Sequence, residues 1–237
     1  MTERKLYFKL DGQSPVAESL RVLRTNIHFI DEKEKKTVVV TSAIPKEGKS
    51  FIAANYAMSE AMVGKKVLLL DCDLRRPRAH STFGVEGRHG LSEVLMGERN
   101  VEELIVKEVE KNLDLLPTKP MEQNVTELLQ SKKMESLVEE VQEKYDLVVI
   151  DTAPLMVATD AAILSKISDG VIFVNGYDMV SKKELLYAKE ILSSAGANIY
   201  GMVVNKIDNS GYGYGYKSHG YYNNNYRYYQ DYIKEDK

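Results

Sequence analysis

The chain has 237 residues, a formal net charge of −3 and a pI of about 5.9. Hydrophobic residues make up 43% and charged residues 28%, which matches soluble globular domains and excludes a fibrous or wholly disordered chain. Because no strongly basic region stands out, we expect no nucleic-acid partner. The single cysteine excludes an intrachain disulfide, and we find neither a secretory signal nor an apolar run of about 20 residues. We therefore expect a cytoplasmic protein, and any association with a membrane would have to come through a partner.

The first predicted element is a helix over residues 15–30. It begins at Pro15, a residue that suits the first turn of a helix. Apolar residues recur at spacings of three and four and form one stripe: Val16, Leu20, Leu23, Ile27 and Ile30. Glu18, Arg21 and Arg24 follow one another at three-residue steps along another face of the same helix.

Short β-branched runs then alternate with helical stretches, which is typical of repeated βαβ units and of a parallel sheet buried on both faces. The expected strands are 37–42, 66–71, 113–116, 146–151, 170–175 and 199–205. The expected helices are 49–63, 125–143, 159–167 and 182–195. The pattern predicts a doubly wound α/β fold with a mainly parallel sheet and flanking helices, in which ligands bind at the carboxyl edge of the sheet.

The last segment of the chain differs in composition from the rest. It is rich in Gly and Asn and offers little aliphatic surface to offset the entropy of ordering, so we expect a flexible tail over 209–237 after a domain of residues 1–208. The tail holds most of the chain's 15 tyrosines: Tyr212, Tyr214, Tyr216, Tyr221, Tyr222, Tyr226, Tyr228, Tyr229 and Tyr232. Taken alone, this cluster is as consistent with an association-prone extension that has no enzymatic role as it is with a segment that has one.

The strongest motif is A-I-P-K-E-G-K-S at residues 43–50, between an expected strand and an expected helix. It matches a Walker A phosphate-binding loop, except that Ala43 replaces the usual first glycine. Backbone N–H groups of such a loop cradle phosphates, Lys49 would reach the β- and γ-phosphates of ATP, and the Ser50 hydroxyl would ligate Mg²⁺. The residues expected to bind nucleotide are Ala43, Lys46, Glu47, Gly48, Lys49, Ser50 and Phe51.

Two further expected strands end in aspartate, at Asp71 and Asp151. Asp151 is followed by Thr-Ala-Pro and matches a Walker B element that would hold Mg²⁺ through water. Since alternate residues of an extended chain point the same way, Asp71 and Asp73 can both face the metal, with Cys72 in the core. We expect Lys49, Asp71, Asp73 and Asp151 to carry the chemistry, and Ser50, Asp73 and Asp151 to lie around the metal.

The set A-x-x-x-x-G-K-S, D-C-D-L-R and D-T-A-P resembles the Walker A, A′ and B motifs of the bacterial tyrosine kinases (BY-kinases) that serve capsular and extracellular polysaccharide synthesis. The resemblance covers nearly the whole chain. It implies that Asp71 activates the tyrosine hydroxyl and that Asp73 supports Mg²⁺. Asn205, at the end of the last strand, resembles the adenine-contacting asparagine of related ATPases. Two loops depart from the family pattern, at Ala153 and at Asn124-Val125.

The resemblance also implies how such a kinase works in a cell. Glu18, Arg21 and Arg24 match an E-x-x-R-x-x-R helix that contacts neighbouring subunits in a ring-shaped homo-oligomer. The tyrosine cluster matches an autophosphorylation tail. Its tyrosines would be phosphorylated in trans by another copy of the kinase with Mg²⁺-ATP and dephosphorylated by a protein tyrosine phosphatase. A separate transmembrane protein, similar to a chain-length regulator, would activate the kinase and recruit it to the membrane, where it regulates polysaccharide synthesis or export.

Two other functions compete with this interpretation. A partitioning or septum-positioning ATPase shares the P-loop fold, but it carries a signature lysine at the position of Ile44. A non-catalytic ATP-binding regulator would have lost catalytic groups, and all of them are present here. Three roles are open for the arginines that follow the second expected strand, Arg75, Arg76 and Arg78. They could bind phosphate, stabilise the site of a neighbouring subunit, or form a solvated face, and the sequence does not distinguish these roles.

Overall fold

The structure is a computed structural model that describes residue 6, residue 9, residues 12–30 and residues 35–207. The chain divides into two units, Met1–Lys206 and Ile207–Lys237, and the fold below is that of the first unit. The predicted tyrosine tail lies outside the described residues, so its flexibility and its boundary stay predictions. None of the helices in the described part combines the length and the apolar character that crossing a bilayer requires.

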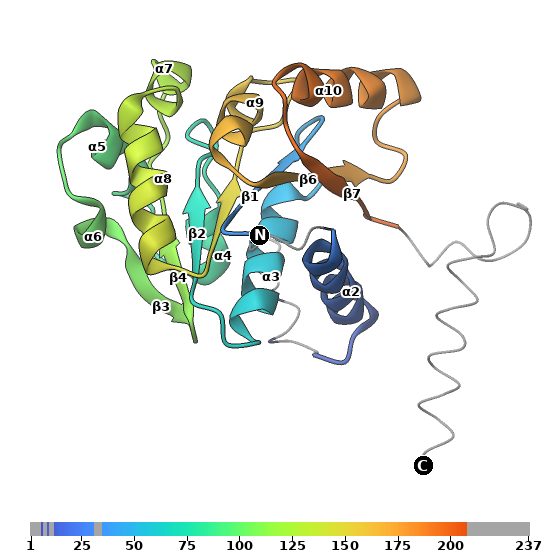
Figure 1. Cartoon of the computed structure of the whole chain (residues 1–237), viewed down its shortest axis with the longest axis horizontal. Coiled ribbons are helices and arrows are strands. Elements are labelled where there is room, and N and C mark those ends of the chain that lie inside the picture. Colours follow the sequence, from blue (N-terminus) through green and yellow to red (C-terminus); the bar gives the residue numbers. More distant parts are fainter. Residues whose placement is uncertain (1–5, 7–8, 10–11, 31–34, 208–237) are drawn as a thin grey trace, which may run out of the picture. The chain divides into compact units, whose positions relative to one another are not determined.

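The core of the unit is a seven-stranded sheet with the order β3-β4-β2-β5-β1-β6-β7 (Figure 1). Its strands are β1 (Thr37–Ser42), β2 (Val67–Asp71), β3 (Val106–Glu110), β4 (Leu113–Leu116), β5 (Leu147–Asp151), β6 (Gly170–Gly176) and β7 (Ile199–Asn205). Every neighbouring pair is parallel except β3 and β4. The predicted α/β fold with a mainly parallel sheet is therefore confirmed.

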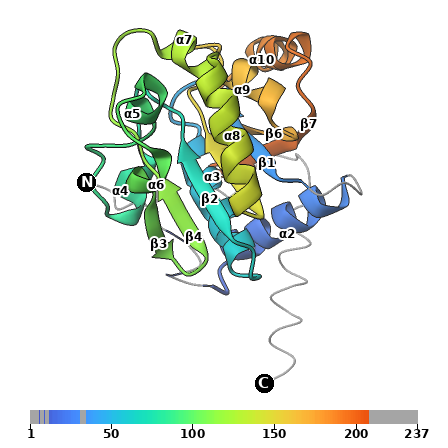
Figure 2. The same cartoon turned by 60° about the vertical axis from the view of Figure 1, so that its left-hand side comes forward.

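Helices cover both faces of the sheet (Figures 1 and 2). They are α2 (Pro15–Phe29), α3 (Lys49–Ala61), α4 (Ala79–Phe83), α5 (Leu91–Met96), α6 (Val101–Leu104), α7 (Val125–Leu129), α8 (Lys132–Lys144), α9 (Asp160–Leu164) with a 3₁₀ turn at Ser165–Ile167, and α10 (Lys182–Ser194). Helices α2, α3 and α4 pack on one face, and α5 to α10 pack on the other.

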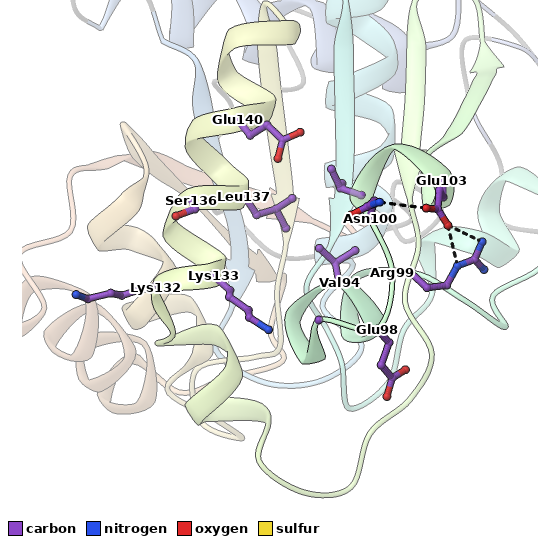
Figure 3. Close-up of a pocket in the computed structure, with 12 residues that line it drawn as sticks. Val94, Glu98, Arg99, Asn100, Glu103, Lys132, Lys133, Ser136, Leu137 and Glu140 are labelled. Carbon is purple, nitrogen blue, oxygen red and sulfur yellow. Dashed lines mark hydrogen bonds and ion pairs between the residues drawn. The ribbon is translucent and has the colours of Figure 1, made fainter.

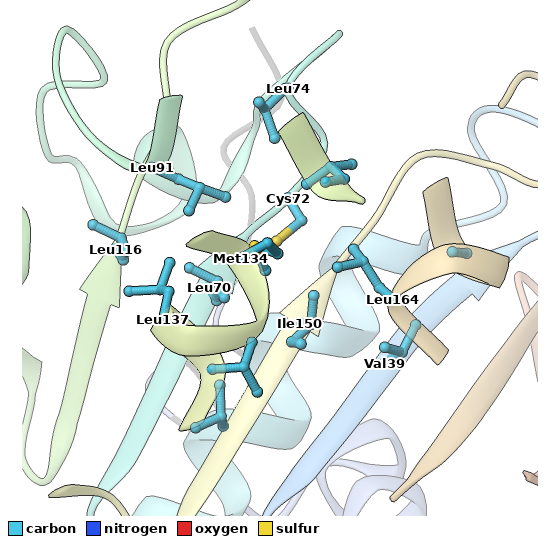
Figure 4. Packing of buried hydrophobic residues seen from close by; sticks show 14 of the residues in the cluster. Val39, Leu70, Cys72, Leu74, Leu91, Leu116, Met134, Leu137, Ile150 and Leu164 are labelled. Atoms are coloured by element: carbon cyan, nitrogen blue, oxygen red, sulfur yellow. The ribbon is translucent and has the colours of Figure 1, made fainter. Parts of the chain in front are cut away.

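Alternate residues of each central strand serve the two faces. Val38 and Val40 of β1 pack under α3, whereas Val39 packs on the opposite side with residues of α8 and α9. Figure 4 shows the second cluster, in which Leu70, Met134 and Ile150 meet between the sheet and the helices. Because both faces are buried, the strands are continuous apolar runs, and this is why the sequence predicted them correctly.

Several elements were not predicted. Strand β3 is a charged edge strand, V-K-E-V-E, whose register shifts where Glu108 has a φ of 49°, so it lacks the apolar run that marks the inner strands. The predicted helix 125–143 is two helices, because Ser131 begins α8 by accepting a hydrogen bond from the Met134 N–H. The short helices α4 to α6 contain four to six residues each, too few for a helical period to be visible.

The packing of Met134 gives a stability prediction. Its side chain is fully buried between α8 and the sheet, so Met134→Ala should leave a cavity and lower the free energy of unfolding by about 2 to 5 kcal/mol. Urea denaturation followed by circular dichroism measures this change. The control is Met62→Ala at the exposed end of α3, which should change stability by less than about 0.5 kcal/mol. Equal losses in the two variants would contradict the assigned packing.

Candidate active site

The carboxyl ends of three neighbouring strands meet at the predicted site. The order β2-β5-β1 places the loop after β1 beside the aspartates that end β5 and β2. Asp71 and Asp151 are register partners in the parallel pair β2 and β5. The sequence expected these residues at one edge of the sheet, and the structure brings them together there.

The loop after β1 is held in shape by side chains from distant strands. The Glu47 carboxylate is buried and accepts hydrogen bonds from the N–H groups of Ile44 at 2.8 Å and Gly176 at 2.9 Å. Asn205, at the end of β7, donates its amide N–H to the Glu47 carbonyl at 2.8 Å. Both residues were predicted to bind nucleotide, and their side chains make these hydrogen bonds around the loop. Glu47 has its backbone N–H left to offer a phosphate.

Gly48 makes the turn from this loop into α3. Its φ of 101° lies in the left-handed region, and a Cβ atom there would come within 2.0 Å of the Asn205 amide nitrogen. Gly48 is also the N-cap and has no side chain to satisfy the first N–H groups of α3. The N–H groups of this first turn and the positive end of the helix dipole make this helix start a suitable place for phosphate.

Lys49 lies between two acidic side chains. Its ammonium group is 2.8 Å from an Asp73 oxygen and 3.4 Å from an Asp151 oxygen, and it also contacts the Ser50 hydroxyl at 3.2 Å. Burial by itself would lower the pKa of Lys49, but the negative charges of Asp151 and Asp73 raise it above its ordinary value. The lysine is therefore charged and positioned to meet an anion that enters the site.

Asp71 and Asp151 are both buried, and burial raises the pKa of each carboxyl group above its ordinary value. For Asp71, burial and the nearby Asp151 charge together raise the pKa to about 7. Asp71 binds the loop that follows it, by accepting hydrogen bonds from the N–H groups of Arg78 at 3.0 Å and Ala79 at 2.9 Å. Cys72 lies in the core as predicted.

A cavity of about 460 Å³ opens over these groups, a volume typical of small-ligand sites. It is lined by the loop and start of α3, by the segment after β2 and by the segment after β5: Pro45, Lys46, Gly48, Lys49, Ser50, Phe51, Asp73, Arg75, Arg76, Arg78, Ala153, Pro154 and Val157. Asp73 therefore reaches the cavity, whereas Asp71 and Asp151 lie behind it. Ala43 is buried in the core below the loop.

A second cavity, of about 490 Å³, lies between the α5–α6 segment and α8 (Figure 3). Two of its acidic side chains have cationic partners, since Glu103 pairs with Arg99 and Glu140 pairs with Lys144. None of the predicted site residues lines this cavity. We therefore assign the chemistry to the cavity over Lys49.

The donor set fits a magnesium ion. Asp151 Oδ2 is buried and has no hydrogen-bond partner, and the Ser50 hydroxyl and the Asp73 carboxylate lie close by around the Lys49 ammonium. Mg²⁺ prefers oxygen ligands and keeps several waters, so few protein groups are needed. Among the described residues, no cluster of three or more His, Cys, Asp or Glu side chains suited to a metal is found.

The other predicted residues lie elsewhere. In α2, Arg21 pairs with Glu18 at 2.8 Å, and Arg24 donates to the Ser59 carbonyl of α3. None of the three helix residues lines the cavity. The tail tyrosines lie outside the described residues. The sequence missed Asp160 of α9, which is buried and pairs with Arg75 at 3.3 Å, because no motif marks it.

The close approach at Gly48 gives a prediction about nucleotide binding. Gly48→Ala would force a Cβ atom against Asn205 and strain the loop, so the affinity for ATP should fall at least about tenfold. Gly64→Ala is a matched control, since Gly64 has a φ of 95° but open space around its Cβ position. Calorimetric titration of both variants measures the difference. Equal affinities would contradict the role assigned to this turn.

The chain is similar to known proteins over most of its length. Residues 35–187 match the AAA domain family. The chain is 38% identical to tyrosine-protein kinase YwqD of Bacillus subtilis over 216 residues, 90% of this chain and 91% of YwqD. It is 34% identical to tyrosine-protein kinase etk of Escherichia coli over 191 residues, 80% of this chain but 26% of etk.

The same relationship is found in three dimensions. The crystal structure of the chimerical protein CapA2B2 has a TM-score of 0.81 and 33% identity to the chain, covering 85% of this chain and 89% of CapA2B2. A P-loop domain of this kind implies nucleotide binding. With such identity to a tyrosine kinase along almost its whole length, the chain belongs to the bacterial tyrosine-protein kinases of the BY-kinase family.

Proposed function

We propose that the chain transfers the γ-phosphoryl group of ATP to tyrosine hydroxyls of its own 209–237 segment, acting in trans between copies of the chain. The observation that carries this proposal is the Lys49 ammonium held between Asp73 and Asp151 at the floor of the cavity. Phosphoryl transfer needs alignment and charge neutralisation more than covalent chemistry, and this arrangement offers both.

The residues divide the work as follows. Backbone N–H groups of the 43–50 loop and the start of α3 hold the phosphates, and Lys49 shifts from its aspartate partners to the β- and γ-phosphates. Ser50, Asp73 and Asp151 would hold Mg²⁺, which would neutralise the charge on the transferred group. Asp71 accepts the proton of the tyrosine hydroxyl, a role supported by its pKa of about 7, near that of an effective base. Since Asp71 lies behind Asp73, the acceptor must enter past Asp73. Asn205 contacts the adenine.

The rival switch ATPase is disfavoured by one structural detail. The signature lysine of that class would stand at Ile44, whose side chain packs against the apolar core here. A lysine there would project from the loop toward a phosphate instead. ATP turnover without any phosphate on the tail would favour this rival.

The test is mass spectrometry of the full chain after incubation with Mg²⁺ and ATP. We expect phosphate on tyrosines of residues 212–232, and Lys49→Met should slow the transfer by at least about 100-fold because the charge that meets the phosphates is lost. Asp71→Asn should slow transfer while ATP binding persists. Lys166→Met is the matched control, since Lys166 is an exposed lysine that does not line the cavity. An unmodified tail in the wild type would overturn the proposal.

We also propose that α2 joins copies of the chain into a ring. Support comes from the E-x-x-R-x-x-R pattern and from an exposed apolar surface on α2, where Val22 is 49% and Phe29 78% exposed. Each phosphotyrosine adds between one and two negative charges, so a modified tail should repel its copies. Unphosphorylated protein should therefore sediment as an oligomer and phosphorylated protein as protomers. Equal sedimentation of the two forms would contradict this.

A membrane protein is the proposed activator, and a protein tyrosine phosphatase the proposed antagonist. The cytoplasmic kinase would be held at the inner face of the membrane by this partner and would regulate capsular or extracellular polysaccharide synthesis or export. Family resemblance supports these assignments. The mass-spectrometric assay is therefore run with and without the cytoplasmic segment of a candidate activator, and identical rates with and without that segment would contradict activation.

A further inference from the structure

The cavity over Lys49 carries more positive charge than a nucleotide site of this construction needs. Arg75, Arg76 and Arg78 all line it, and they come from the segment that follows β2, not from the phosphate loop. The loop amides, the start of α3 and Lys49 already provide for the nucleotide phosphates. The three arginines therefore bring guanidinium groups from a separate segment to the same cavity, where a second anionic group could bind.

The arginine segment is fixed to the two aspartates of the site. The Arg76 N–H donates to the Asp73 carboxylate at 3.0 Å, and the Arg78 N–H donates to the Asp71 carboxylate at 3.0 Å. The backbone of the segment thus keeps a constant distance from the groups that would receive the acceptor tyrosine. An anion bound by these arginines would lie beside that tyrosine.

The Arg75 side chain is held by two contacts with distant parts of the chain. Its Nε donates to Asp160 and its Nη2 to the Thr126 hydroxyl, each at 3.3 Å. Asp160 is fully buried at the start of α9, where removing a charge from water is costly unless it is paired. No other acceptor in the described part of the chain contacts this guanidinium, so Nη1 remains available to a ligand. Thr126 of α7 and Asp160 of α9 therefore hold the Arg75 guanidinium in a fixed orientation at the cavity.

We propose that Arg75, oriented by Asp160 and Thr126, selects acceptor tyrosines that have an anionic group beside them. The anion is either a carboxylate or a phosphate on a neighbouring tyrosine, because both accept a charge-assisted hydrogen bond from a guanidinium group. The proposal rests on the proposed tail kinase activity and specifies its substrate class. Arg75 binds the acceptor segment, and Asp160 and Thr126 are positioning residues.

Acidic residues are unevenly distributed along the tail sequence, so Arg75 could distinguish its tyrosines. Tyr232 follows Asp231 directly and is succeeded by Glu235 and Asp236. The stretch 212–222 contains no acidic residue and includes Lys217. The selector predicts that phosphate appears first in the 226–232 part of the tail and spreads afterwards to 212–222, as each new phosphate supplies an anion for the next tyrosine.

The experiment is a time course of the full chain with Mg²⁺ and ATP, with phosphate on each tail peptide measured by mass spectrometry. In the wild type, early phosphate on residues 226–232 should exceed that on 212–222 about tenfold, the factor given by one charge-assisted hydrogen bond. Arg75→Ala and Thr126→Val should reduce this ratio to about one. Thr126→Ser, which keeps the hydroxyl, should retain it, as should Arg99→Ala in the remote Arg99–Glu103 pair.

A tail carrying Asp231→Asn, Glu235→Gln and Asp236→Asn separates the two sources of the anion. If this tail loses the order of tyrosine phosphorylation from the first time point, the anion is a carboxylate. If the order develops after a lag, the anion is a phosphate on a neighbouring tyrosine. If the tail tyrosines are phosphorylated in the same order in Arg75→Ala as in the wild type, the inference is overturned. If that variant also has a raised KM for ATP, Arg75 serves the nucleotide instead. Absence of tail phosphate in the wild type would instead overturn the proposed function.

Discussion

The ion pairs of Lys49 with Asp73 and Asp151 are the interaction on which the site depends. Three charged groups are buried together at the end of a parallel sheet, and such burial is tolerated only when the charges are paired. This pairing requires the strand order β2-β5-β1, which brings residues about 100 positions apart in the chain into contact. The two helical layers can then be understood as the packing that keeps this sheet edge rigid.

Much of the fold and of the site could be predicted because the relevant signals are local. Apolar runs predicted six of the seven strands: the five inner strands are buried on both faces, and the edge strand β7 contains the apolar run 202–204 although it is partly exposed. The phosphate loop and the strand-ending aspartates were found for the same reason: each lies next to the strand that positions it. Strand β3 was missed because an edge strand exposes charged side chains and resembles a loop in sequence.

The remaining features depend on contacts between distant parts of the chain. Glu47 was expected to bind nucleotide, but its side chain is bound by Gly176, 129 residues away. Arg75 and Asp160 are 85 residues apart, and no sequence motif predicts that they contact each other. Both are long-range pairs between loops, and a single sequence contains no periodicity or spacing that reports them. The function of a loop residue can therefore be inferred from sequence more readily than the partner that holds it.

The position of Cys72 has a practical consequence. The thiol is fully buried in the apolar cluster beside β2, and burial together with the negative charge of Asp71 raises its pKa well above the ordinary value. The thiolate, the form that reacts with alkylating agents, is accordingly scarce while β2 is in place. Because the chain has one cysteine, the rate of its chemical labelling reports directly how often this strand end opens to solvent.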